Sequence, residues 1–238
     1  MTRRARHGDV TVTDGDSPAQ GFWWLRGALS CDDLAVLTDA ARELARAAPL
    51  ATPTMRDGTP FRLRQTGAGL VWWSDREGAR YTDRHPATGR AWPAIPESMR
   101  RIARLAVGAA VERGARIDAD ELAEAFDSAL VIFYRAGDSL GWHADITEAA
   151  GPAWPILTIS AGAPAIFEID VGDRRHRARL LAGDAVILEG PARVAQHRIA
   201  RVESPGMFDG AGGIDRGRLA VTFRRARAGW TLTRSGDE

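Results

Sequence analysis

Apolar residues recur at a helical period in the first half of the chain. After a capping box formed by Ser30 and Asp33, apolar positions return every three or four residues until Pro49 interrupts the pattern. A second run of this kind predicts a helix over residues 96–113, and residues 22–29 predict a short strand before the first helix. Each helix has one apolar stripe, so each is expected to pack on a larger body.

The second half of the chain has the pattern of short strands instead. From Asp127 onward, Gly, Pro and Asp separate β-type runs at 129–134, 156–160, 165–171, 178–181, 185–188, 194–199 and 218–224. Many short strands with turn signals between them are typical of a sandwich or barrel rather than a parallel sheet. Residues 54–92 are dense in Gly, Arg and aromatic residues, which predicts hairpins and loops. The expected fold class is therefore α+β, with two helices buttressing a C-terminal β-barrel.

Length and composition define the class of protein. The 238 residues are 45% hydrophobic and 26% charged, which excludes a disordered chain. We expect a flexible N-terminal arm over residues 1–20 and a single domain over residues 21–238. No apolar run reaches the roughly 18 residues of a transmembrane helix, and a single Cys31 excludes a disulfide framework. These features predict a cytoplasmic protein that does not associate with membranes.

The charged residues are unusual in kind rather than in balance. The net charge is +1, and all 32 basic residues are arginine. A compositional bias accounts for this, although the arginine fork also suits phosphate and carboxylate recognition. A net charge near zero gives no global argument for nucleic-acid binding, so any function must be argued from local sites.

Two of the five histidines stand where a metal site could form. His143 and Asp145 alternate in an extended segment, so their side chains point to the same side and could meet one ion. His197, in a distant run flanked by apolar residues, could supply a third ligand, whereas His85 lies in a polar loop and is expected at the surface. Two histidines and one carboxylate form the facial triad of non-haem Fe(II) oxygenases. Zinc could occupy the same ligands, and a lone His-x-Asp is also found as a solvated loop pair.

Two arginines favour iron over zinc. Arg218 and Arg224 flank an apolar run, and their even spacing on a strand places both on one face, about 20 Å apart if the strand is ideal. Cations that point into a barrel are costly unless anions match them. A dicarboxylate cosubstrate would supply one anion at each end, whereas the alternative is two surface arginines in an arginine-rich chain.

Taken together, these motifs resemble those of a known family. His143-x-Asp145, His197 and Arg218-x₅-Arg224 occur in the order and spacing of the Fe(II)/2-oxoglutarate dioxygenases, and the chain is identified as a member of their AlkB family of nucleic-acid dealkylases. Residues 91–96, 162–167 and 219–223 are also similar to AlkB segments, and the resemblance extends over residues 22–228. It implies a double-stranded β-helix (jelly roll) core at about 127–230 and a nucleotide-recognition lid at about 50–92.

The resemblance also implies roles for single residues. The implied iron ligands are His143, Asp145 and His197. The implied 2-oxoglutarate ligands are Arg218 with the Tyr134 hydroxyl at the distal carboxylate, and Arg224 at the carboxylate next to the keto group. The implied substrate residues are Trp72, which stacks on the target base, and Thr147, which stands where the family has an acidic residue that reads the base. Trp73 is expected to be core.

The chain departs from the family at four positions. Ile132 and Ala220 replace two asparagines near the cosubstrate, Thr147 replaces the acidic residue, and Ala79 replaces a lid tyrosine. The iron triad and the two arginines are therefore intact, whereas polar support of the cosubstrate and readout of the base are altered.

The implied function is oxidative demethylation of N-alkylated bases in DNA or RNA. The reaction would use Fe(II), O₂ and 2-oxoglutarate and release succinate, CO₂ and formaldehyde. Single-stranded nucleic acid is the expected partner, because a paired base must first be flipped out, and no obligate protein partner is expected. One alternative is an oxygenase acting on a modified tRNA base, a protein side chain or a small metabolite, which Thr147 and Ala79 motivate. Another is a jelly-roll binding module without turnover, which Ile132 and Ala220 motivate.

Overall fold

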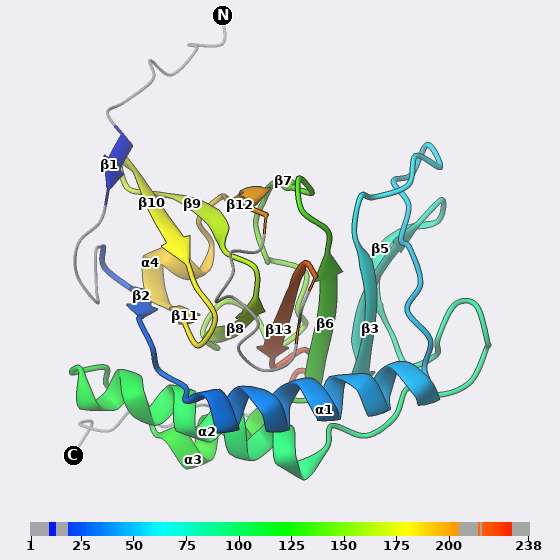
Figure 1. Cartoon of the computed structure of the whole chain (residues 1–238), viewed down its shortest axis with the longest axis horizontal. Coiled ribbons are helices and arrows are strands. Elements are labelled where there is room, and N and C mark those ends of the chain that lie inside the picture. The colour runs from blue at the N-terminus through cyan, green and yellow to red at the C-terminus, as the bar shows by residue number, and fades with distance from the viewer. Residues whose placement is uncertain (1–9, 13–18, 205–213, 215, 230–238) are drawn as a thin grey trace, which may run out of the picture.

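Two β-sheets face each other, and helices cover the outer side of the larger sheet (Figure 1). The computed structural model describes residues 10–12, 19–204, 214 and 216–229. Strands of the six-stranded sheet, in spatial order, are β2 (Phe22–Leu25), β11 (Ala185–Leu188), β8 (Ile156–Gly162), β13 (Arg218–Arg224), β6 (Ser128–Tyr134) and β3 (Arg64–Gly69). Those of the five-stranded sheet are β1 (Val10–Val12), β10 (Arg174–Leu180), β9 (Ala165–Val171), β12 (His197–Val202) and β7 (Leu140–His143). This arrangement confirms the predicted jelly-roll core.

A separate hairpin lies beside the six-stranded sheet. It consists of β4 (Val71–Asp75) and β5 (Gly78–Thr82), which pair antiparallel. It belongs to the region predicted as a lid, but that region also contains β3, which is an integral edge strand paired with β6. The hairpin and its flanking loops are thus the part of residues 50–92 that stands outside the two main sheets (Figure 1).

The helices confirm the apolar stripes and add one element. Helix α1 (Cys31–Ala47) begins at the predicted capping box, in which the Asp33 backbone N–H donates to the Ser30 hydroxyl, and α2 (Glu97–Glu112) fills the second predicted range. The prediction of two buttressing helices was incomplete, because α3 (Ala119–Ala125) also packs against this core. The seven residues of α3 are too few to show a helical period in the sequence. None of the described helices is long and apolar enough to cross a membrane.

The capping box gives a test of local stability. Replacing Ser30 by alanine removes the oxygen that accepts the Asp33 N–H, so we expect the free energy of unfolding to fall by about 1 kcal/mol. Chemical denaturation measures the loss. Ser30→Asn, which keeps a capping side chain, should stay close to the parent, and equal stability of Ser30→Ala and the parent would contradict this role.

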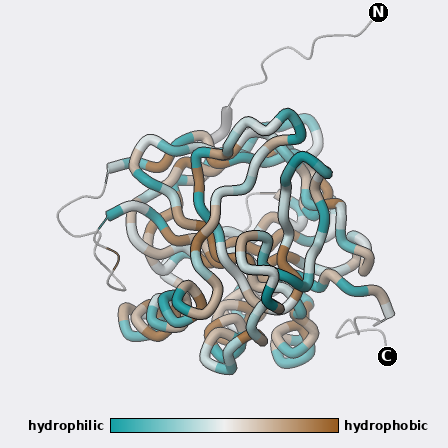
Figure 2. The backbone as a smooth tube through the Cα atoms, turned by 90° about the vertical axis from the view of Figure 1, so that its right-hand side faces the viewer, coloured by the Kyte–Doolittle hydropathy of each residue, from teal (hydrophilic) through white to brown (hydrophobic). Residues whose placement is uncertain are grey.

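The central strands are buried on both faces, which brings polar side chains inside. Along β13, Leu219, Val221 and Phe223 pack in the core under the helices. The alternate side chains point into the cavity between the sheets; they are Arg218, Ala220, Thr222 and Arg224. Figure 2 shows the hydrophobic positions concentrated in this interior and the hydrophilic ones on outer turns and loops. The even spacing of the two arginines therefore predicted their common face correctly.

Some predicted boundaries differ from the structure. The strand expected at 22–29 ends at Leu25, and the strand expected at 194–199 begins only at His197, because the short α4 (Gly190–Arg193) and its cap precede it. Val10–Val12 of the predicted arm pair in parallel with β10, and residues 1–9 and 13–18 lie outside the described residues. The division into an arm and one domain stays a prediction.

Candidate active site

The three predicted metal ligands meet at the end of the five-stranded sheet. His143 ends β7 and His197 begins β12, and the two are direct partners in the antiparallel ladder, with ring centroids 4.3 Å apart. Asp145 follows two residues later, with its Oδ2 atom 3.8 Å from His197 Nε2. One ligand atom from each residue lies within 4.8 Å of the others, so the group could hold a metal ion. These three residues are called the metal cluster below.

Backbone carbonyls orient both imidazoles. His143 Nδ1 lies 2.8 Å from the Gly141 oxygen, and His197 Nδ1 lies 3.1 Å from the Ala195 oxygen. With the proton on each Nδ1 donated to these carbonyls, each Nε2 keeps its lone pair for a metal. Burial is the main cause that lowers the pKa of His197 to about 4, so its imidazole is neutral at pH 7, as a ligand must be.

Asp145 is held as a carboxylate by the cation beside it. Arg224 Nη2 donates to Asp145 Oδ2 at 2.8 Å. Burial acts to raise the pKa of Asp145, but the charge of Arg224 is the largest cause acting the other way, and the pKa lies below its usual range. The site thus presents an ionised carboxylate beside two imidazoles, which is the donor set of a facial triad.

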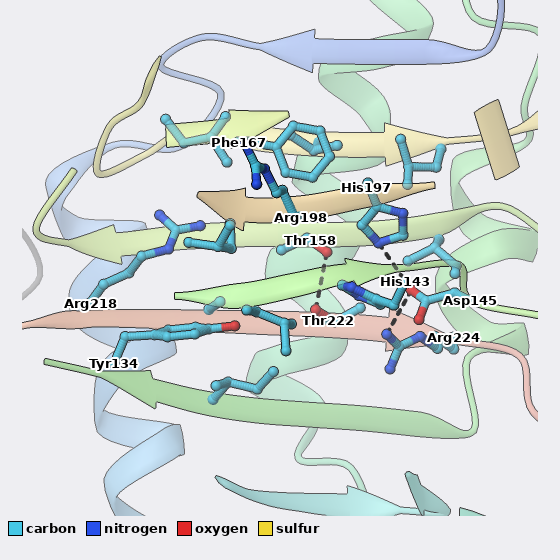
Figure 3. Close-up of a pocket in the computed structure, with 18 residues that line it drawn as sticks. Tyr134, His143, Asp145, Thr158, Phe167, His197, Arg198, Arg218, Thr222 and Arg224 are labelled. Carbon is cyan, nitrogen blue, oxygen red and sulfur yellow. Dashed lines mark hydrogen bonds and ion pairs between the residues drawn. The ribbon is translucent and has the colours of Figure 1, made fainter. Parts of the chain in front are cut away.

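Arg218 lies at the opposite end of the cavity between the sheets from the three predicted metal ligands (Figure 3). The Arg218 side chain is fully buried, and its Nη2 donates to the Ser160 hydroxyl at 2.9 Å. Among the residues that the structure describes, its Nε and Nη1 have no hydrogen-bond partner and no carboxylate lies within ion-pair distance. Burial lowers the pKa of Arg218 to about 10. Tyr134 is its direct partner across the strands and lines the same cavity.

Two of the residues that depart from the family pattern are neighbours on the wall of this cavity. Ala220 of β13 and Ile132 of β6 are register partners and belong to one apolar cluster. Two positions that are asparagine in the family are therefore both apolar here, and they lie side by side on adjacent strands. The pair forms an apolar wall between the two polar ends of the cavity.

A second cavity, of 510 Å³, opens beside the metal cluster. Trp72 lines it, as do three of the four departures, namely Ile132, Thr147 and Ala79. Trp73, the next residue, is 5% exposed and belongs to the core, as expected. The Gln65 side chain donates to the Trp72 carbonyl at 2.7 Å, which fixes this part of the hairpin against β3.

Sequence reasoning missed a buried ion pair behind the metal cluster. Arg193 of α4 donates to Glu148 at 3.0 Å, and both side chains are almost completely buried. Arg193 also binds the backbone oxygen of Asp145, so it holds the loop that carries this ligand. Glu148 follows Asp145 by three residues, which is the only local signal, whereas Arg193 is 45 residues further along the chain.

The expectation for His85 was wrong. Its side chain is 1% exposed, its Nε2 lies 2.7 Å from the Pro49 oxygen, and its ring packs against Trp92. A polar neighbourhood in the sequence therefore did not indicate exposure, because the partners of this histidine come from other segments.

A jelly roll that brings two histidines and one carboxylate together has the ligand set of the mononuclear non-haem Fe(II) oxygenases. The chain matches the 2OG-Fe(II) oxygenase superfamily over residues 21–224. It belongs to this superfamily and, within it, to the AlkB dioxygenases. It is 35% identical over 211 residues to the "Alpha-ketoglutarate-dependent dioxygenase AlkB homolog" of Caulobacter vibrioides (strain NA1000 / CB15N), covering 87% of this chain and 88% of that protein.

Further matches extend the comparison. A solved structure described as "The structure of OsALKBH1" superposes with a TM-score of 0.71 at 28% identity, covering 86% of this chain and 97% of the other. Two shorter matches are the "DNA N(6)-methyladenine demethylase ALKBH1A" of Arabidopsis thaliana and the "tRNA demethylase abh1" of Schizosaccharomyces pombe. They are 35% and 31% identical and cover 39% and 40% of this chain, but only 26% and 32% of those proteins.

The residues present fit the cofactors of the family. Fe(II), O₂ and 2-oxoglutarate are the reactants of this class of enzyme. The donor set of the cluster suits Fe(II) with open positions left for other ligands. Arg218 and Arg224 lie at opposite ends of one cavity, and each has guanidinium atoms that make no hydrogen bond with the described part of the chain. These atoms suit the two carboxylates of 2-oxoglutarate.

Proposed function

We propose that this dioxygenase removes N-alkyl groups oxidatively from the bases of single-stranded DNA or RNA. The observation that carries the proposal is the adjacency of two cavities at one metal cluster. One has a buried arginine at its far end, and the other is lined by Trp72 and is large enough for a nucleobase. The names of the Arabidopsis and S. pombe relatives, a DNA and a tRNA demethylase, support a nucleic-acid substrate.

The protein supplies positions and charges for this reaction. His143, Asp145 and His197 would hold Fe(II), which with 2-oxoglutarate supplies the oxidising chemistry: O₂ is reduced, succinate and CO₂ are released, and a C–H bond of the alkyl group is hydroxylated. The hydroxylated N-methyl group then leaves the base as formaldehyde. Because the chemistry resides in the cofactors, this chain contributes by binding them in register with the substrate.

The two arginines orient the cosubstrate. Arg218 would bind the distal carboxylate through its free Nε and Nη1 atoms, with the Tyr134 hydroxyl beside it. Arg224, which already holds Asp145, would bind the carboxylate next to the keto group and so fix that end against the metal. Ile132 and Ala220 form an apolar wall between these ends.

The second cavity would hold the base. Trp72 offers an aromatic face for stacking, and Thr147 lies at the rim beside the metal ligand Asp145. A base in a duplex has to be flipped to enter, so single strands should be the easier substrates. No obligate protein partner is proposed, and a cytoplasmic location stays a prediction.

Replacing Trp72 by alanine tests the base cavity. Loss of one stack should weaken binding of a methylated single-stranded oligonucleotide by about 1–3 kcal/mol, whereas 2-oxoglutarate decarboxylation without substrate should be nearly unchanged. Fluorescence anisotropy measures the first quantity and succinate release the second. Trp72→Phe retains a ring and should recover most of the affinity. An equal fall of both quantities in Trp72→Ala would show that this residue is structural.

A further inference from the structure

A chain of polar contacts connects the β4–β5 hairpin to the metal cluster. Tyr81 of β5 donates its hydroxyl to Glu148 Oε1 at 2.7 Å. The same Oε1 atom lies 3.6 Å from Arg224 Nε, which is too long for a hydrogen bond. Arg224 in turn donates to Asp145 at 2.8 Å, the contact drawn in Figure 3. A residue of the hairpin is therefore three contacts away from a metal ligand.

The hairpin residue in this chain is the direct neighbour of the base-stacking residue. Trp72 and Tyr81 are register partners in the antiparallel β4–β5 ladder. Directly opposite residues project on the same face of a ladder, with Cβ atoms about 5 Å apart. Trp72 lines the cavity proposed for the base. A base stacked on Trp72 would therefore contact the face of the hairpin from which Tyr81 binds Glu148.

The other side of Glu148 is fixed. Its Oε2 atom accepts from Arg193, which is fully buried and also donates to the Trp154 oxygen at 2.7 Å. The Oε1 atom can therefore accept either from the Tyr81 hydroxyl, as it does here, or from Arg224 Nε. Arg224 Nε and Nη1 have no hydrogen-bond partner among the described residues. They stay available for a carboxylate as long as Tyr81 keeps Glu148 Oε1 at its present distance.

We propose that Tyr81 and Glu148 are positioning residues that couple base binding at Trp72 to binding of 2-oxoglutarate at Arg224. The base restrains the hairpin, the Tyr81 hydroxyl holds Glu148 Oε1, and Arg224 keeps its free N–H groups for the carboxylate of the cosubstrate. When the hydroxyl is absent, Glu148 moves onto Arg224 Nε and competes with the cosubstrate. This inference rests on the proposed function, because it takes Trp72 as a contact of the base.

The coupling is measured by binding without turnover. Under anaerobic conditions, calorimetry gives the affinity of the Fe(II)-loaded enzyme for 2-oxoglutarate with and without a single-stranded oligonucleotide that carries one methylated base. In the parent we expect the oligonucleotide to tighten 2-oxoglutarate binding at least about fivefold. By linkage, 2-oxoglutarate must tighten oligonucleotide binding by the same factor, which checks the result independently. In Tyr81→Phe both factors should fall below about twofold.

A matched control separates coupling from hairpin stability. Thr82 is the next residue of the hairpin, and its hydroxyl bonds to the Arg84 backbone on the exposed side. Thr82→Val also removes one hydroxyl from β5, yet it should keep the coupling factor of the parent. Loss of coupling in Thr82→Val, or a parent factor of one, would overturn the inference.

Two results separate this inference from the proposed function. If the parent binds the methylated oligonucleotide and Tyr81→Phe shows undiminished coupling, the inference fails and the proposed function stands. If the parent does not bind the oligonucleotide at all, both fail.

Discussion

Replacing His197 by alanine should abolish turnover, and so should replacing His143. Each change removes one of three ligands from a cluster whose imidazoles are already oriented by the Gly141 and Ala195 carbonyls. Changes in the groups that merely orient ligands cost 10- to 100-fold, so loss of a ligand itself should leave less than about one tenth of the parent activity. Fe(II) binding, measured by metal analysis after gel filtration, should fall in parallel.

A histidine outside the cluster serves as the control. His176 is buried in β10, where its ring packs against Phe22, and His176→Gln should retain the iron content of the parent. Activity above one tenth of the parent in His143→Ala or His197→Ala would remove that residue from the proposed ligand set.

The second large effect concerns the cosubstrate. Arg218→Lys should raise the 2-oxoglutarate concentration needed for half-maximal activity more than about tenfold, because lysine has no planar fork for a carboxylate. The loss of a partner from a buried charge pair costs about 3–5 kcal/mol, and a tenfold change remains after the lysine and solvent compensate part of it. Arg218 is fully buried, so little water can assist. The apolar pair Ile132 and Ala220 offers no polar substitute nearby.

Iron binding tells this effect from general damage. Arg218 lies at the end of the cavity away from the triad, so the affinity for Fe(II) should change less than about twofold. Arg201→Lys, on the exposed side of β12, is the matched control and should behave as the parent. The same 2-oxoglutarate dependence in Arg218→Lys and the parent would contradict the assignment and favour a site that holds only a metal.

The parts of the structure that could be predicted are those encoded in local order. Alternation along one strand placed Arg218 and Arg224 on one face, and alternation after β6 placed His143 beside Asp145. Helix α1 was recognisable because its cap and its stripe lie in one continuous segment. In each case the physical cause acts over a few residues, so the sequence shows it directly.

What could not be predicted depends on distant partners. Glu148 gives no sign of being buried until Arg193, 45 residues away, is placed against it. The partner of the buried His85 is a carbonyl oxygen 36 residues earlier in the chain. The Tyr81 hydroxyl donates to Glu148, which lies 67 residues later. A polar residue stays buried only where partners satisfy it, and the fold rather than the local sequence brings them.

The most direct test of the account is product analysis on a methylated single strand. The purified enzyme is incubated with Fe(II), 2-oxoglutarate, O₂ and oligonucleotides of DNA and RNA that each carry one N-methylated base. Formaldehyde, succinate and the mass of the oligonucleotide are then measured. We expect formaldehyde, and succinate above the substrate-free background, in equal amounts on at least one substrate, together with loss of the methyl group, and none of these with His197→Ala. Succinate release with every oligonucleotide unchanged in mass would contradict base demethylation.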